Sequence, residues 1–402
     1  MRRWIVGLGV WLLLVLPTAS GQVRSGADVL LGDSLHLLHG RRIGLMANHT
    51  SRLSDGRMLF DSLRSLPGVT VAALFSPEHG FRGTAADGVA IGSDTVAGVP
   101  LHSLYGATRR PTPDMLAGLD VLVMDLQDIG VRYYTYLSTM AMCLEAAAEA
   151  GLPVLLCDRP NPLGGLIIEG PIRNDSLRSF VGYLPLPVRH GLTAGEAMRM
   201  AVGEGWLADS AAPRLTVLPC AGWKRNMYHD DTGLPWINPS PNMRSPDAAL
   251  AYVGTCLLEG TNLNEGRGTE EPFLRFGAPF IDGDTLASML NALELRGVRF
   301  HALRYRPIPM PGAPNPRFSG RVCGGVRLEI TNRHCYESFR TGLEIIAVLR
   351  RQHDAFLSFR SYLDLLSGIR GTKDRSVFDL LDRADADRRD FLPLRAPYLL
   401  YP

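Results

Sequence analysis

The amino-acid sequence predicts an α/β fold in which a parallel sheet is sandwiched by helices, followed by a smaller C-terminal α+β domain. Strand-like apolar runs alternate with helix-like stretches between residues 42 and 158, which is the order expected for a parallel sheet. Two of these runs, VLVMD and VLLCD, are apolar without alternation, as strands buried on both faces are. From about residue 278 the pattern changes, because a proline-rich stretch precedes a strand-like run and an amphipathic helix.

The individual elements can be placed from their periodicity and their end signals. We expect strands at 42–48, 69–76, 119–128 and 152–158, and helices at 55–66 and 136–151. Gly151 and Pro153 mark the end of the alanine-rich helix and the start of the next strand. A further helix has Thr193 as its N-cap, with Glu196 three residues later, as in a capping box. In the C-terminal domain we expect a strand at 324–331 and a helix at 338–353.

The N-terminus has the features of a secretion signal. Two arginines precede an apolar run from Trp4 to Leu16, and small residues follow it up to Gly21. We therefore expect a signal peptide at 1–21, a sheet domain at 22–277, the smaller domain at 278–402, and a periplasmic or secreted protein. The apolar run is short for a membrane span, so no span is expected after cleavage; an uncleaved anchor is the alternative.

Charge and cysteine content narrow the class of protein. The chain has 42 Lys and Arg against 40 Asp and Glu, so no large basic field exists to bind nucleic acid. Three of the six cysteines, Cys143, Cys157 and Cys256, lie in apolar stretches and are expected to be buried free thiols. Cys323 and Cys335 flank a strand-like run and could form a disulfide.

Polar side chains follow four of the predicted strands, at the edge of a sheet where ligands of open α/β folds bind. They are Asn48, His49 and Thr50, then Glu78 and His79, then Asp125, Gln127 and Asp128, and finally Asp158, Arg159 and Asn161. This is more carboxylate, amide and imidazole than loop solubility requires. The sequence therefore predicts a binding site at this edge.

The sequence lacks the motifs of several common classes of binding site and enzyme. No G-x-G-x-x-G follows the first strand and no Walker-type loop is present, which argues against NAD and nucleotide binding. No H-E-x-x-H or tight His/Asp cluster occurs, so no metal or other cofactor is expected. A G-x-S-x-G elbow is also missing, which argues against a serine hydrolase. Carboxyl groups without such machinery favour glycoside hydrolysis, which uses one acid as proton donor and a second group to stabilise charge or activate water.

Glu78, in the stretch FSPEHGFRG, is the candidate proton donor. At a strand end beside Phe75, Pro77 and Phe81 it would be partly removed from water, which favours the protonated form of a carboxyl group. The alternative is that Glu78 only caps the following turn. Glu169, in LIIEGPI, is the candidate second carboxylate, and its alternative is an ion pair with an arginine, Arg159 or Arg173.

Two further stretches contribute candidate sugar contacts. The segment around PSPNM and EGTNLNEGRGTEEPF combines amides, acids and an arginine with glycines that allow close backbone approach, and its candidates are Asn242, Asn262, Glu265 and Arg267. A polar loop that joins the two domains is the alternative. In QDIGVRYYTY, Arg132 could hold a ligand carboxylate beside Tyr133, although tyrosines at a helix start often serve packing.

These motifs together resemble a known family. NHTS, FSPEHGFRG, DLQDIGVRYYTY, DRPNPLGG, EGP, PSPNM, TCLLEGTNLNEGRGTEEPF and the terminal YLLY are similar to segments of the NamZ-type exo-β-N-acetylmuramidases. The resemblance implies a Rossmann-like domain with its active site in a cleft shared with a smaller C-terminal domain. It also implies release of β-1,4-linked N-acetylmuramic acid from the non-reducing end of peptidoglycan fragments.

The resemblance gives the candidate residues their expected roles. It implies that Glu78 and Glu169 are the catalytic acids, and that Arg82, Arg132 or Arg267 lies near the lactyl carboxylate of muramic acid. The expected partner is thus a peptidoglycan-derived saccharide. The competing hypothesis is a non-catalytic muropeptide-binding or cell-wall-binding protein that uses the same cleft.

Overall fold

The computed structural model describes residues 22–86, 89, 92, 94–208 and 213–402. The predicted signal peptide at 1–21 therefore lies outside the described residues. Within the described ranges, no helix is both long enough and apolar enough to span a bilayer.

The N-terminal part is built on a seven-stranded sheet with the strand order β3-β4-β2-β1-β5-β6-β7. Its strands are β1 (Arg41–Ala47), β2 (Val69–Ser76), β3 (Asp94–Val96), β4 (Val99–Ser103), β5 (Val121–Asp125), β6 (Val154–Cys157) and β7 (Leu215–Leu218). All neighbouring strands are parallel except the edge pair β3 and β4. The strands at 42–48, 69–76, 119–128 and 152–158 are confirmed within a few residues.

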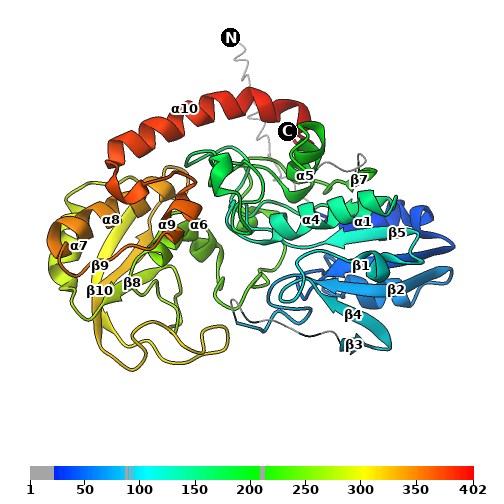
Figure 1. Ribbon diagram of the computed structural model, residues 1–402, viewed down its shortest axis with the longest axis horizontal. Helices are drawn as coiled ribbons and strands as arrows, with labels where there is room; N and C mark the ends of the chain where they lie inside the picture. The colour runs from blue at the N-terminus through cyan, green and yellow to red at the C-terminus, as the bar shows by residue number, and fades with distance from the viewer. Residues whose placement is uncertain (1–21, 87–88, 90–91, 93, 209–212) are drawn as a thin grey trace, which may run out of the picture.

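Helices cover both faces of this sheet (Figure 1). One face packs on α1 (Gly26–Asp33) and α2 (Leu59–Arg64), and the other on α4 (Tyr136–Glu149) and α5 (Ala194–Gly203). Side chains of β1 alternate between the two cores: Leu45 packs in the core that contains Leu59, and Met46 in the core that contains Cys143. Burial on both faces explains why these strands read as continuous apolar runs. The α/β prediction is confirmed.

The C-terminal part has a smaller antiparallel sheet with the order β8-β10-β9. Its elements are α6 (Pro246–Thr255), β8 (Arg275–Ala278), α7 (Gly283–Asn291), β9 (Val298–Tyr305), β10 (Cys323–Ile330), α8 (Ser338–His353) and α9 (Tyr362–Ser367). The predicted boundary after residue 277 falls inside β8. The remaining short helices are α3 (Pro113–Leu116), η1 (Leu35–Leu38), η2 (Asp175–Leu177), η3 (His229–Thr232), η4 (Cys256–Gly260), η5 (Thr372–Asp374) and η6 (Ala396–Tyr398).

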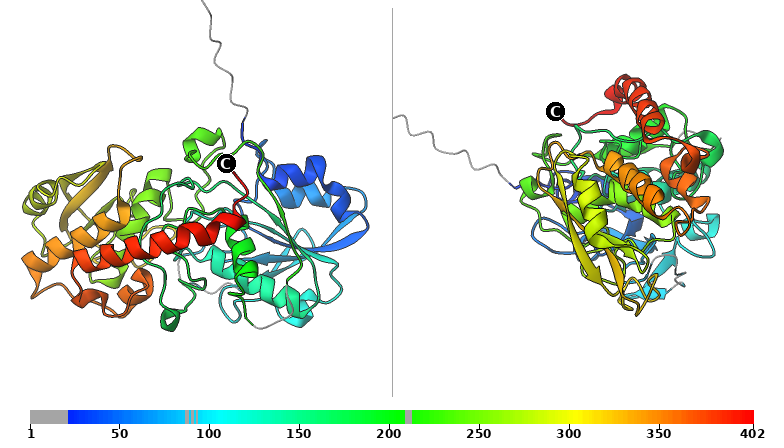
Figure 2. Two further views of the ribbon diagram at one scale, coloured as in Figure 1. Left: turned by 90° about the horizontal axis from the view of Figure 1, so that it is seen from above. Right: turned by 90° about the vertical axis from the view of Figure 1, so that its left-hand side faces the viewer.

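A long helix, α10 (Val377–Arg395), runs along one side of the molecule from the smaller sheet toward the larger one (Figures 1 and 2). Beyond it the chain returns to the larger sheet, where the hydroxyl of Tyr401 donates to Asp158 Oδ2 at 2.5 Å. The Tyr401 ring also packs edge-on against Trp223. The last residues therefore tie the two parts of the chain together.

Two local predictions can be compared with the structure. The helix expected to begin after Thr193 starts with a capping box between Thr193 and Glu196, as predicted, and ends at Gly203. The cysteines expected to be buried free thiols are free and buried, and Cys323 and Cys335 are also free.

Candidate active site

A cavity of about 480 Å³ lies beyond the carboxyl end of β2, with walls from both parts of the chain. Five predicted site residues line it: Glu78, His79, Tyr133, Asn242 and Arg267. The cavity is also lined by aromatic side chains, which include Tyr252, Phe273 and Tyr362. Flat apolar surfaces beside a few placed polar groups are typical of a saccharide site.

Glu78 sits where β2 ends and the sheet opens into the cavity. Its residue is 8% exposed, so the carboxyl group is largely shielded from bulk solvent. The hydroxyl of Thr135 donates to Glu78 Oε2 at 2.8 Å from the residue just before α4. One carboxyl oxygen is thereby fixed, which orients the group within the cavity.

The turn after Glu78 has an unusual backbone. His79 has a φ of 70°, in the left-handed region that non-glycine residues rarely adopt, and Gly80 follows with a φ of 75°. The His79 Nδ1 atom lies 2.9 Å from the carbonyl oxygen of Ala85. Because a carbonyl only accepts hydrogen bonds, Nδ1 carries the proton in this contact. The apolar run therefore stops in a tight, strained turn that presents Glu78 and His79 to the cavity.

The second carboxylate of the cavity is Glu259, at the end of η4. Arg267 Nη1 contacts Glu259 Oε1 at 2.8 Å and Glu265 Oε1 at 2.7 Å, and its Cζ atom lies 5.0 Å from the centroid of the Phe273 ring. Phe273 also has a left-handed backbone, with a φ of 66°. Arg267 thus bridges two carboxylates and orients that of Glu259. Glu259 begins the EGTNLNEGRGTEEPF segment that also contains Glu265 and Arg267, but it is not one of the sugar contacts predicted from that segment.

Tyr133 and Asn242 fix the walls of the cavity through backbone contacts. The Tyr133 hydroxyl donates to the carbonyl oxygen of Val253 in α6 at 2.5 Å, which links the start of α4 to the C-terminal part. The Asn242 amide donates to the carbonyl oxygen of Gly312 at 3.0 Å. Both residues line the cavity and hold its two sides together.

Four predicted contacts at the sheet edge are used inside the protein instead. Asn48 donates to the Tyr136 hydroxyl, Asp125 pairs with Arg159, Gln127 donates to the Pro160 carbonyl, and Asn161 donates to the Leu192 carbonyl. None of the four lines the cavity. In contrast to the prediction that they contact substrate, these four side chains bond to other parts of the protein.

Arg132 is also a structural residue. It is buried, and its guanidinium group donates to the carbonyl oxygens of Pro171, Leu186 and Leu366 at 2.5 to 2.9 Å. Burial lowers the pKa of Arg132 to about 9. Both Nη atoms bond to these carbonyl oxygens and Arg132 does not line the cavity, in contrast to the prediction that it holds a ligand carboxylate.

Two other predicted contacts lie outside the cavity. Arg82 is exposed in a separate hollow that it shares with Trp236. The Asn262 amide donates to the carbonyl oxygen of Phe356 at 2.8 Å, and its Oδ1 accepts from the Ser358 N–H. These positions do not support a role for either residue in binding a ligand in the cavity beside Glu78.

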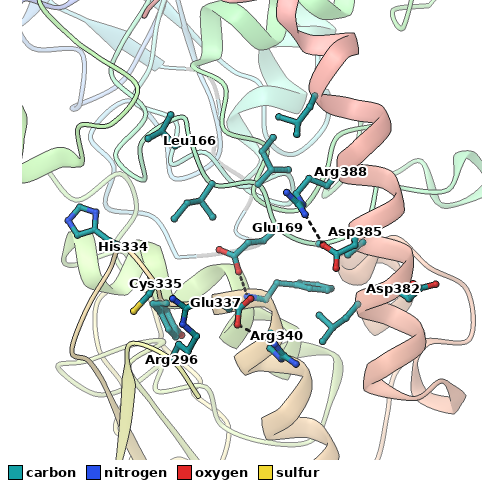
Figure 3. A pocket seen from close by; sticks show the side chains of 18 of the residues that line it. Leu166, Glu169, Arg296, His334, Cys335, Glu337, Arg340, Asp382, Asp385 and Arg388 are labelled. Carbon is teal, nitrogen blue, oxygen red and sulfur yellow. Dashed lines mark hydrogen bonds and ion pairs between the residues drawn. The ribbon is translucent and has the colours of Figure 1, made fainter. Parts of the chain in front are cut away.

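Glu169 lies in a different cavity, of about 600 Å³, between the 166–170 loop, the start of α8 and α10 (Figure 3). Its Oε1 pairs with Arg189 at 2.8 Å, and its Oε2 accepts from the Phe339 N–H at 2.9 Å. It shares no cavity with Glu78. The expected role of Glu169 across the cleft is therefore not supported, and the ion-pair alternative holds with a different arginine from the two considered.

Within the described ranges, no group of three His, Cys, Asp or Glu side chains is placed to hold a metal ion. The cavity lining supplies carboxyl groups, hydroxyls, an imidazole and guanidinium groups.

Asp128 gives the sheet edge a pH-dependent stability. It is buried, and loss of hydration raises its pKa to about 7, a rise that the hydrogen bond from the Gly130 N–H at 2.6 Å opposes. Between pH 4 and 7 the unfolded chain has released this proton while the folded chain retains it. Asp128 therefore contributes most to the free energy of unfolding below about pH 4. As the pH rises from 4 to 7, this contribution decreases by about 1.4 kcal/mol per pH unit.

We expect Asp128→Asn to remove this dependence, because asparagine still accepts from Gly130 without gaining a charge. The variant should match the wild type near pH 4 and have the higher free energy of unfolding at pH 8. Urea unfolding followed by tryptophan fluorescence at both pH values measures the difference. Parallel stability curves for the two proteins would show that Asp128 titrates normally.

Two models of one protein family together match most of the chain. The family model described as exo-beta-N-acetylmuramidase NamZ, N-terminal, matches residues 43–247, and the C-terminal model of that family matches residues 250–401. The chain is 41% identical over 390 residues to the peptidoglycan beta-N-acetylmuramidase NamZ of Bacillus subtilis strain 168, an alignment that covers 94% of this chain and 92% of the relative.

Two solved structures share the fold. Both are crystal structures of DUF1343 family proteins from Bacteroides fragilis NCTC 9343, with TM-scores of 0.86 and 0.76. They are 34% and 33% identical to this chain, of which they cover 95% and 94%, and each is covered over 99% of its own length.

Proposed function

The chain belongs to the NamZ family of exo-beta-N-acetylmuramidases and is a glycoside hydrolase, and from this premise we propose that it releases N-acetylmuramic acid from the non-reducing end of β-1,4-linked peptidoglycan fragments. The observation that carries the proposal is the shielded carboxyl group of Glu78 in a cavity walled by both parts of the chain. A cavity of about 480 Å³ suits an enzyme that takes one terminal sugar at a time.

In the proposed mechanism Glu78 is the general acid. It gives its proton to the glycosidic oxygen while the bond from that oxygen to the anomeric carbon breaks. A water molecule then adds its oxygen to the anomeric carbon, and the released proton restores the Glu78 carboxyl group. The hydrogen bond from Thr135 keeps Glu78 in one orientation through both steps.

Glu259 is the second acidic group in this proposal. Arg267 orients its carboxylate within the same cavity as Glu78. A carboxylate in this position can stabilise the positive charge that develops on the sugar ring or activate the attacking water. This role replaces the one that the sequence suggested for Glu169.

We also propose that the protein is exported to the periplasm or secreted. Its proposed substrate is part of the cell wall, outside the cytoplasmic membrane, and the predicted signal peptide supports the same location.

The decisive experiment uses two disaccharides that differ only in sugar order. N-acetylmuramyl-β-1,4-N-acetylglucosamine should be split into equal amounts of its two sugars, measured by liquid chromatography and mass spectrometry. N-acetylglucosaminyl-β-1,4-N-acetylmuramic acid should remain intact, because its muramic acid is not at the non-reducing end. Saturable binding of muropeptides without release of free sugar would contradict the proposal and identify a cell-wall-binding protein.

A further inference from the structure

One part of the rim of the Glu78 cavity is formed by three side chains from two separate segments. Tyr105 and Arg109 lie in the connection after β4, and Phe180 lies in the loop after η2. The Arg109 Cζ atom is 4.4 Å from the centroid of the Phe180 ring and 5.9 Å from that of the Tyr105 ring. The two ring centroids are 5.8 Å apart. The rings form an aromatic shelf that supports the guanidinium group.

Contacts with ring faces hold a guanidinium group without using its N–H donors. Arg109 is exposed, and across the described part of the chain no carboxylate pairs with it. A second arginine of the cavity lining, Arg267, is by contrast paired with Glu259 and Glu265. Arg109 is therefore the cation at this site that can accept an anionic group of a ligand.

The chemistry of the cavity is asymmetric, with carboxyl groups deeper inside and an available guanidinium group at the rim. A guanidinium group offers paired N–H donors that match the two oxygens of a carboxylate. N-acetylmuramic acid differs from N-acetylglucosamine by a lactyl ether that ends in a carboxylate. We propose that Arg109, held on the aromatic shelf, binds this carboxylate and makes the enzyme select muramic acid over the uncharged sugar. This inference rests on the proposed function.

Binding and turnover together test the inference. The affinities of wild type and Arg109→Gln for N-acetylmuramic acid and for N-acetylglucosamine can be measured by titration calorimetry. The substitution should weaken binding of muramic acid by about tenfold or more, since a charge-assisted pair is lost, and should affect glucosamine much less. In turnover of a chromogenic N-acetylmuramide, the loss should appear mainly as a higher KM.

The salt dependence of sugar binding distinguishes a charge interaction from a purely structural role of Arg109, which would not depend on salt. Because Arg109 lies at the exposed rim, added salt screens its interaction with a carboxylate. The preference of the wild type for muramic acid should therefore decrease between low and high salt, while the smaller preference of Arg109→Gln should stay nearly constant. Arg109→Lys keeps the charge without the forked donors and should lie between the two proteins.

Arg110→Gln is the matched control. It removes the same charge from the next residue, which pairs with Glu149 of α4 and does not line the cavity. This variant should retain the wild-type preference. A wild-type preference in Arg109→Gln would overturn the inference. A wild-type protein that prefers muramic acid, loses this preference in Arg109→Gln and yet cleaves neither disaccharide would keep the inference and overturn the proposed function.

Discussion

Replacing Glu78 with glutamine should lower kcat by about 10²–10⁴-fold, the range expected when a general acid is lost. Glutamine has nearly the same shape and still accepts the hydrogen bond from Thr135, so the cavity should keep its geometry. It cannot donate a proton to the glycosidic oxygen as that bond breaks. The KM and the affinity for N-acetylmuramic acid should therefore change little. Steady-state turnover of a chromogenic N-acetylmuramide measures kcat and KM separately.

Glu169→Gln is the control variant for Glu78→Gln. It removes the same charge from a carboxylate that lies in another cavity, paired with Arg189. Its main effect should be on the free energy of unfolding, because the buried guanidinium group of Arg189 loses its counter-charge. A folded Glu169→Gln protein that loses as much turnover as Glu78→Gln, or a Glu78→Gln protein with nearly native kcat, would contradict the assignment of the acid.

The elements that the sequence predicted correctly are those whose pattern is local. Continuous apolar runs gave β5 and β6 because both faces of these strands are covered, and the capping box of Thr193 gave the start of α5. Partners that lie far away in the chain left no such pattern. The short edge strand β3 is mostly exposed, so its sequence resembles that of a loop. The same holds for the way in which Tyr401 returns to Asp158, which is 243 residues away.

In the candidate site, too, features that depend on local sequence could be predicted, and those that depend on distant partners could not. The position of Glu78 could be predicted because Pro-Glu-His-Gly directly follows a strand. This places the acid at the edge of the sheet without contacts to distant segments. The role of Arg132 could not be predicted, since its carbonyl partners include Leu366, 234 residues later. The place of Arg109 in the cavity wall was not predicted, because its contact with Phe180 joins two separate segments. The sequence shows which residues carry a charge, but the pairing of these charges depends on the fold.

The ion pair between Asp125 and Arg159 shows how a strand-end carboxylate can be structural. Arg159 Nε contacts Asp125 Oδ1 at 2.6 Å and Nη2 contacts Oδ2 at 2.8 Å, while Nη2 also donates to the carbonyl oxygen of Arg52. Asp125 is fully buried at the end of β5, and Arg159 follows the neighbouring strand β6. The pair thus fixes two adjacent strand ends behind the loops that form the cavity.

Arg159→Met is expected to lower the free energy of unfolding by about 3–5 kcal/mol at neutral pH, because it leaves a buried carboxylate without its cation. Burial raises the pKa of Asp125, and Arg159 opposes that rise. Without Arg159 the folded protein holds the Asp125 proton to higher pH than the unfolded chain does. The cost should therefore be smallest near pH 4 and grow as the pH rises. Urea unfolding of both proteins from pH 4 to 8 measures it.

Two further variants separate loss of the ion pair from loss of any arginine. Arg57→Met breaks an ion pair with Asp55 at the surface and should lower the free energy of unfolding far less than Arg159→Met does, since water already solvates both groups. Asp125→Asn combined with Arg159→Met removes the buried charge as well and should recover part of the lost stability at pH 8. If Arg159→Met cost no more than Arg57→Met, or if its cost did not change with pH, the pair would contribute no more than a surface contact, and the strand ends would be held by packing alone.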